Sequence, residues 1–174
     1  TYLPTTNYNG TDSFTYIASD GTNTSNPATV TITVSPVNDA PEPQSGTVGC
    51  NEDEGRDDFP LPAGDVDGDD LTYSIELYPE NGTLTLNPSE IPDVYPYNAT
   101  FSYFPTPNYN GTDSFTWSVN DGTVDSEPAT ITINIYPIND APTVSNMALT
   151  IDEDEIYLGT LSGSDIDGDE LTFG

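Results

Sequence analysis

The chain of 174 residues carries a net charge of −29, because 30 aspartates and glutamates are opposed by a single cation, Arg56, and there is no histidine. Nucleic-acid binding needs lysine and arginine to displace phosphate counterions, and docking on anionic lipid needs a polybasic patch, so the composition excludes both kinds of partner. Hydrophobic residues make up 33% of the chain, which is lean for one large core but adequate for small β-sandwiches with thin cores.

A long internal repeat organises the chain. Residues 2–41 return at 103–142 with a constant offset of 101 and 26 identities in 40 positions. The repeating unit is therefore 101 residues long, which is the size of an immunoglobulin-like sandwich. We expect three segments in chain order: the C-terminal part of one repeat at 1–41, a complete repeat at 42–142 and the N-terminal part of a third repeat at 143–174.

Within the expected complete repeat, short segments alternate between polar and apolar residues with a period of two, which is typical of strands with one buried face. In chain order these segments are 71–77, 83–86, 101–104, 115–119 and 131–135. Asparagine- and glycine-containing turn signals separate them, and no segment shows helical periodicity with caps. The predicted fold is all-β: an antiparallel Greek-key β-sandwich with Phe115 and Trp117 on the same buried face.

Cysteine usage and hydropathy bear on how the chain is stabilised and where it resides. Cys50 is the only cysteine, so no intrachain disulfide can form, and a metal ion is the obvious alternative stabiliser in an extracellular setting. No run of about 18 apolar residues is present, so this segment is not expected to insert directly into a membrane. Thr1 opens in mid-pattern, and we expect any export signal or anchor to lie outside the segment.

The motif at 65–69, Asp-Val-Asp-Gly-Asp, recurs as Asp-Ile-Asp-Gly-Asp at 165–169. Carboxylates at every second position of an extended segment would project to one side and repel one another unless a cation lay between them. Calcium suits such a cluster because it takes six to eight oxygen ligands. An EF-hand is rejected, since glycine falls at the fourth position instead of the sixth and no flanking helices are predicted, although Glu76 stands at the twelfth.

Two linkers, Pro-Val-Asn-Asp-Ala-Pro at 36–41 and Pro-Ile-Asn-Asp-Ala-Pro at 137–142, combine oxygen ligands with prolines that restrict the backbone. General turn statistics favour a simple linker for one such copy. Two copies, each followed by an acidic patch (51–54 or 152–155) and then by the aspartate motif, favour a metal site between repeats instead.

The linker, the acidic x-Glu-x segment, Asp-x-Asp and the strand-end Ser-Asp-Gly at 19–21 or Asn-Asp-Gly at 120–122 together resemble the cadherin family. The likeness is to the bacterial and archaeal cadherin-like, immunoglobulin-like tandem repeats of large surface adhesins, and it covers essentially the whole chain. It implies calcium between consecutive domains. The implied ligands are Asn38, Asp39, Asp65, Asp67 and Asp121 at the first junction, and Glu52, Asn139, Asp140, Asp165 and Asp167 at the second.

The chain departs from the animal cadherin pattern in two places. Ala40 and Ala141 stand where the animal linker has a second asparagine, and the Asp-Arg-Glu segment is absent, with Asn-Gly-Thr-Asp in that neighbourhood. The resemblance also places the glutamate of the first junction before Thr1. The number of ions per junction therefore stays open, and Asp69 and Asp70 are either replacement ligands or solvated surface.

An aromatic group after the proline-rich loops has two interpretations. Its members could stack on sugars, or they could cover the end of the sandwich, which is the commoner role of aromatic residues that alternate in and near strands. The group consists of Tyr95, Tyr97, Phe101 and Tyr103.

The sequence thus predicts an extracellular, cell-surface array of adhesive or structural repeats, stiffened by calcium, whose partners are neighbouring repeats or protomers and a surface glycan or protein target. The alternative is a protomer of an extracellular filament whose partial domains are completed by neighbouring chains. A hydrolase with paired carboxylates is not expected, because the acidic pairs repeat between units and fall at junctions, as ligands should.

Overall fold

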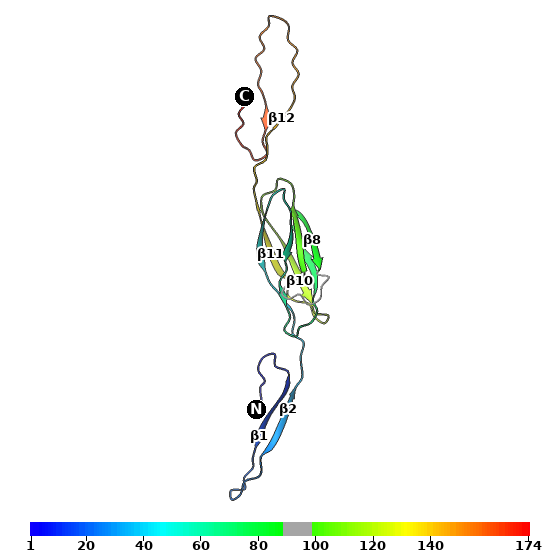
Figure 1. The fold of residues 1–174 in the computed structure, drawn as a ribbon, viewed down its shortest axis with the longest axis vertical. Helices are drawn as coiled ribbons and strands as arrows, with labels where there is room; N and C mark the ends of the chain where they lie inside the picture. Colours follow the sequence, from blue (N-terminus) through cyan, green and yellow to red (C-terminus); the bar gives the residue numbers. More distant parts are fainter. Residues whose placement is uncertain (89–98) are drawn as a thin grey trace.

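The computed structural model describes residues 1–88 and 99–174, and in these ranges the chain consists of strands and loops. Three segments follow one another along an extended molecule, with the sandwich in the middle (Figure 1). The predicted all-β class and the antiparallel sandwich are confirmed. None of the described elements is a helix long and apolar enough to cross a bilayer.

The N-terminal segment is a hairpin of two antiparallel strands, β1 (Gly10–Tyr16) and β2 (Ala28–Val34), in which Gly10 pairs with Val34 and Tyr16 with Ala28. Alternate positions of β2 are apolar, and Phe14 and Tyr16 of β1 lie on the same face together with Asp12, so this face of the hairpin is largely apolar. That face is open to solvent in this structure: Phe14 is 51% and Tyr16 is 54% exposed.

The central sandwich packs two main sheets face to face. One sheet has the strand order β4-β11-β10-β7, and the other has the order β5-β9-β8, with a short β3-β6 pair beside them. All pairs are antiparallel except β4 with β11, which run parallel. The strands are β3 (Glu42–Pro43), β4 (Gly46–Asn51), β5 (Arg56–Pro60), β6 (Ala63–Gly64), β7 (Thr72–Leu77), β8 (Gly82–Pro88), β9 (Ala99–Pro105), β10 (Gly111–Asn120) and β11 (Ala129–Tyr136).

The core lies between these two sheets, and its aromatic residues come from both. Phe115 and Trp117 on β10 are fully buried on the same face, as predicted. Phe115 meets Phe101 of the opposite sheet edge to face, with ring centroids 4.8 Å apart. Trp117 stacks on Tyr73 of β7 at 5.8 Å. Burial of this apolar surface is the main driving force for the sandwich.

The structure describes two of the four aromatic residues that could stack on sugars. Phe101 and Tyr103 are fully buried in the core, so neither ring is available for stacking on a sugar. Tyr95 and Tyr97 lie outside the described residues.

The C-terminal segment contains two short strands, β12 (Thr143–Val144) and β13 (Gly163–Ser164), which pair antiparallel. Most of its large apolar side chains are exposed; Leu158, for example, is 92% exposed. The acidic loop of this segment, at 165–169, lies against the preceding linker, because the Asp140 N–H donates to Asp167.

Candidate metal centres at the two junctions

The loop that follows β6 gathers three carboxylates. One Asp65 oxygen, Oδ1, accepts hydrogen bonds from the backbone N–H groups of Asp67 at 2.8 Å, Gly68 at 2.9 Å and Asp69 at 3.2 Å. Gly68 has a φ of 81°, which permits this tight wrapping. One carboxylate oxygen from each of Asp65, Asp67 and Asp69 lies within 4.8 Å of the others. The cluster can hold a metal ion.

The sequence-based reason given for this cluster was wrong. The expectation was an extended segment with alternate carboxylates on one side, whereas the structure has a bent loop at 65–69. The aspartates converge because the loop curls around the Asp65 carboxylate, which is the usual behaviour of an aspartate that accepts backbone hydrogen bonds two and three residues ahead.

The linker of the first junction is held against this loop. The Asp39 N–H donates to Asp67 Oδ2 at 2.8 Å, and the Asn38 amide nitrogen donates to Asp121 Oδ2 at 2.8 Å. Asp121 is 7% exposed, and its other oxygen accepts the N–H groups of Thr123 and Val124. These backbone donors, Val124 foremost, and the Asn38 amide lower the pKa of Asp121, so it stays ionised. Hydrogen bonds therefore link all five implied ligands of this junction, with Asp39 linked through its backbone.

The second junction repeats this arrangement. The Asp140 N–H donates to Asp167 Oδ2 at 2.6 Å, as Asp39 does to Asp67. Asp165 Oδ1 accepts the N–H groups of Asp167 at 3.0 Å and Asp169 at 3.2 Å. The Asn139 amide donates to the Asp140 carbonyl at 2.9 Å. The bond from the linker to the loop and the turn around the first aspartate therefore recur, whereas among the described residues three carboxylates within 4.8 Å of one another are found at the first junction alone.

Glu52 reaches the second junction from the end of β4. It is 1% exposed, its Oε1 accepts the Ile138 N–H of the linker at 2.8 Å, and its Oε2 accepts the Asn110 amide at 3.3 Å. All of these donors are neutral. The only lysine or arginine in the chain, Arg56, lies over the Phe59 ring at 4.6 Å. A buried carboxylate without a cationic partner is costly, so this site favours a cation.

Neighbouring carboxylates repel one another at both junctions. Burial, and then the neighbouring carboxylates Asp53, Asp167, Glu52 and Asp165, raise the pKa of Asp140. At the first junction, burial and then four neighbouring aspartates raise the pKa of Asp69; in decreasing order of effect they are Asp65, Asp67, Asp121 and Asp70. Such mutual repulsion is relieved when a divalent cation binds between the carboxylates.

Two carboxylate oxygens give a direct test of whether a cation fits. Asp65 Oδ2 and Asp140 Oδ2 are buried, and neither has a hydrogen-bond partner within residues 1–88 and 99–174. Buried polar atoms in native proteins are almost always satisfied. A donor set made of carboxylate and amide oxygens suits a hard cation such as calcium, so the residues present fit that ion.

Two acidic residues of these centres were missed or left open by sequence reasoning. Asp69 belongs to the cluster, whereas Asp70 is exposed and is not among its three members. Asp53 was not considered, yet it is the carboxylate with the strongest effect on Asp140. Its place in the acidic segment at 51–54, repeated at 152–155, was the available signal.

These features define a class of protein: an immunoglobulin-like sandwich with an acidic junction to the segment on either side of it. The model of the family described as bacterial Ig domain matches residues 1–33 and 38–134. The chain belongs to this family.

Curated relatives come from Dictyostelium discoideum. Integrin beta-like protein B is 35% identical over 91 residues, covering 48% of this chain and 5% of that protein. Integrin beta-like protein C is 25% identical over 187 aligned positions, covering 95% of this chain and 10% of that protein. The chain therefore spans a tenth or less of the length of these relatives. Among solved structures, an endo-fucoidan hydrolase of glycoside hydrolase family 107 matches with a TM-score of 0.42 and 25% identity, over 78% of this chain and 20% of that one.

Proposed function

We propose that this chain is part of an extracellular, cell-surface array of structural or adhesive repeats in which calcium binds at the junctions and restricts bending between domains. In this proposal residues 42–142 form one whole repeat, and 1–41 and 143–174 belong to its two neighbours. The array extends toward a target and binds it, and no catalytic step is involved. Its partners are neighbouring repeats or protomers, and a surface glycan or protein is the adhesive target.

The observation that carries the proposal is the pair of buried, unpartnered carboxylate oxygens, Asp65 Oδ2 and Asp140 Oδ2, one at each junction. Each belongs to a cluster that joins a linker to an aspartate loop of the following segment. A calcium ion there would attract the linker and the loop at once. Bending the junction would then separate the ion from part of its ligands, so the ion stiffens the array.

The expected result in solution is a calcium-dependent change in both length and stability. In millimolar calcium the maximum dimension from small-angle X-ray scattering should be greater, and the melting temperature higher, than in chelator. A free calcium concentration of 100 times the dissociation constant adds about 2.7 kcal/mol to the free energy of unfolding.

Because the chain carries a net charge of −29, any salt screens its self-repulsion. A separate sample in magnesium, without chelator, tests a second divalent ion. The matched control is sodium chloride at the same ionic strength in chelator. Equal dimensions and equal melting temperatures in calcium and in this control would contradict the proposal.

Glu52→Gln tests the second junction separately. The substitution keeps an oxygen that can accept the Ile138 N–H but removes a buried charge. We expect calcium affinity at this junction, measured by calorimetry, to fall on the order of tenfold, because ligand charge tunes calcium affinity. The control is Glu153→Gln, which changes the same motif position in the exposed acidic segment at 152–155. Equal losses in the two variants would mean that Glu52 acts only through net charge.

A filament protomer is the second candidate, and the open apolar face of the β1–β2 hairpin favours it. Phe14 is 51% exposed there, whereas Phe115, at the same repeat position, is fully buried in the central sandwich. Strands from a neighbouring protomer could cover such a face. A monodisperse monomer by gel filtration, with no fibres in electron micrographs, would count against this candidate.

A further inference from the structure

The loop before β10 places an asparagine in an uncommon backbone conformation beside the second junction. Asn108 has a φ of 58°, and the turn around it is closed by a hydrogen bond of 3.0 Å from the Tyr109 N–H to the Thr106 carbonyl. The same turn precedes β1, where Asn7 has a φ of 61° and the Tyr8 N–H donates to the Thr5 carbonyl at 3.1 Å. Both repeats therefore present an asparagine in the left-handed region.

These turns face the acidic centres. Asn108 lines a hollow together with Asp140 and Asp165, and Asn7 lines the matching hollow of the first junction with Asp39 and Asp65. In each hollow the asparagine comes from the preceding segment, whereas the aspartates come from the linker and from the loop that follows it.

The second turn is also tied to the centre through its backbone. The Asn108 N–H donates to Asp53 Oδ1 at 2.9 Å. This bond holds the tip of the loop against the acidic group.

Each hollow is also lined by an aspartate that has one oxygen without a partner. Asp140 lines one hollow and Asp65 lines the other, and the Oδ2 atom of each is buried and accepts no hydrogen bond from the described residues. Glu52, 1% exposed, adds a buried charge that accepts the Ile138 N–H of the same linker at 2.8 Å. These buried oxygens and this buried charge favour a cation near the linker and the aspartate loop, whose residues line the same hollow as the asparagine.

Left-handed geometry alone explains only part of the choice of asparagine. Glycine adopts this conformation at no steric cost and would serve the turn as well. Asparagine adds an amide oxygen, which can ligate calcium without adding to the repulsion among the surrounding carboxylates.

We propose that Asn108, and Asn7 at the equivalent position, supplies a neutral side-chain oxygen to the junction cation from the preceding domain. The inference rests on the proposed calcium function. In this proposal the asparagine is a ligand on the side of the ion opposite the aspartate loop. The ion is then held by both domains as well as by the linker.

The test is calcium titration of the full chain by calorimetry, for the wild type, Asn108→Gly and Asn108→Asp. Asn108→Gly keeps the left-handed turn and removes the oxygen, so its melting temperature in chelator should equal that of the wild type while its calcium affinity falls about tenfold. Asn108→Asp keeps an oxygen and tolerates the same backbone region, so it should bind at least as tightly as the wild type.

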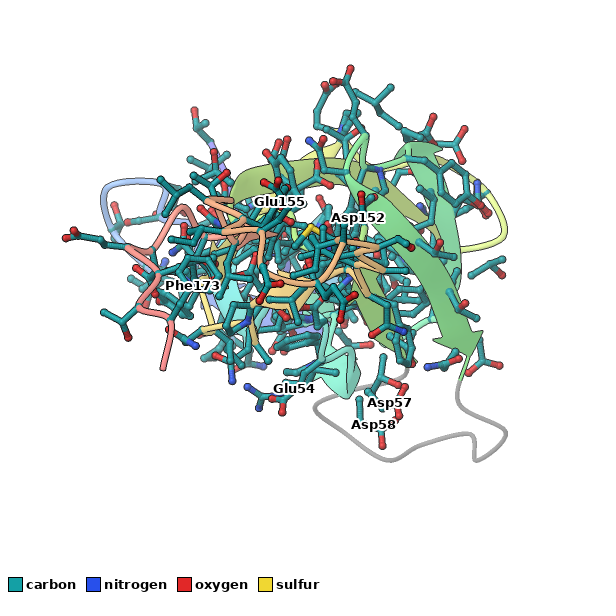
Figure 2. All side chains as sticks on the ribbon, turned by 90° about the horizontal axis from the view of Figure 1, so that it is seen from above. Glu54, Asp57, Asp58, Asp152, Glu155 and Phe173 are labelled. Carbon is teal, nitrogen blue, oxygen red and sulfur yellow. The ribbon has the colours of Figure 1, made fainter. Side chains whose placement is uncertain are left out.

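The matched control is Asp58→Gly. Asp58 also has a left-handed φ, of 60°, but it lies on β5 at the rim of the molecule, beside Asp57, when the molecule is viewed down its long axis (Figure 2). This control removes a full negative charge, whereas Asn108→Gly removes none. Calcium affinity should therefore fall more in Asn108→Gly than in Asp58→Gly.

The outcomes separate the inference from the function on which it rests. If the wild type binds calcium and Asn108→Gly binds equally well, Asn108 is a turn residue only and the inference is overturned while the calcium function stands. If the wild type does not bind at millimolar calcium, the calcium function fails and the inference falls with it. Asn7→Gly, which should weaken binding at the first junction to a similar degree, provides a second, independent test.

Discussion

Replacing Phe115 by alanine is expected to lower the free energy of unfolding of the central sandwich by about 3–5 kcal/mol. The ring is fully buried and packs edge to face on Phe101, which belongs to the opposite sheet. Its removal leaves a cavity between the two layers as well as losing apolar burial. Since domains of this size have about 5–15 kcal/mol of stability in total, the variant is expected to be close to unfolding at 37 °C.

The measurement is urea denaturation followed by the fluorescence of Trp117, the only tryptophan of the chain, which is itself buried in this core. Urea is preferable to guanidinium because it is uncharged and does not screen the repulsion of the carboxylates. The matched control is Phe14→Ala, which has the same neighbours Gly-Thr-Asp-Ser before it and Thr after it, but is 51% exposed. It should change stability by less than about 0.5 kcal/mol, and equal effects at both positions would contradict this packing.

Asp113→Ala is the second substitution with a large expected effect. The Asp113 carboxylate is 7% exposed and accepts four hydrogen bonds through its two oxygens. The donors are the N–H groups of Glu80 at 3.1 Å, Asn81 at 2.8 Å and Ser114 at 2.8 Å, and the Tyr103 hydroxyl at 2.8 Å. The carboxylate therefore joins the β7–β8 turn to the core tyrosine of β9.

Alanine at this position would leave the Tyr103 hydroxyl and two turn N–H groups without their acceptor, at a cost of about 1–3 kcal/mol for each buried donor. We expect the urea midpoint to fall by an amount comparable to that for Phe115→Ala. Asp12→Ala is the matched control: Asp12 binds the Tyr2 hydroxyl at 2.9 Å and the Ser13 N–H at 2.7 Å, but all of these groups are exposed to water. Water replaces lost acceptors there, so a large effect of Asp12→Ala would show that burial is not the cause.

The fold was largely predictable from sequence where alternation is clear. The five alternating segments correspond to β7, β8, β9, β10 and β11. Strands β4 (Gly46–Asn51) and β5 (Arg56–Pro60) were missed, because the first contains two glycines and the second two consecutive aspartates, one of them in a left-handed conformation. Their strand character comes from pairing with β11 and β9, which is a long-range property.

The candidate centres were predictable in kind but only partly in membership. Repetition of the linker and of the aspartate motif pointed to two junctions, and the structure gathers acidic residues at both. Asp53 and Asn108 were not predicted, because their nearness to Asp140 depends on where two separate turns of the preceding segment end up in space. The spacing of these residues along the chain does not indicate that they lie close together in space.

By itself, the sequence determined the acidic charge, the 101-residue repeat, the oxygen-rich chemistry of the junctions and the alternation that produces a β-sandwich. Only the tertiary structure decided which residues from distant parts of the chain meet. Phe101 and Phe115 belong to different sheets and pack edge to face, and Asp113 of β10 accepts the hydroxyl of Tyr103 from β9. The physical reason is that burial, and with it the energetic value of an aromatic ring or a carboxylate, depends on which distant strands pack against it.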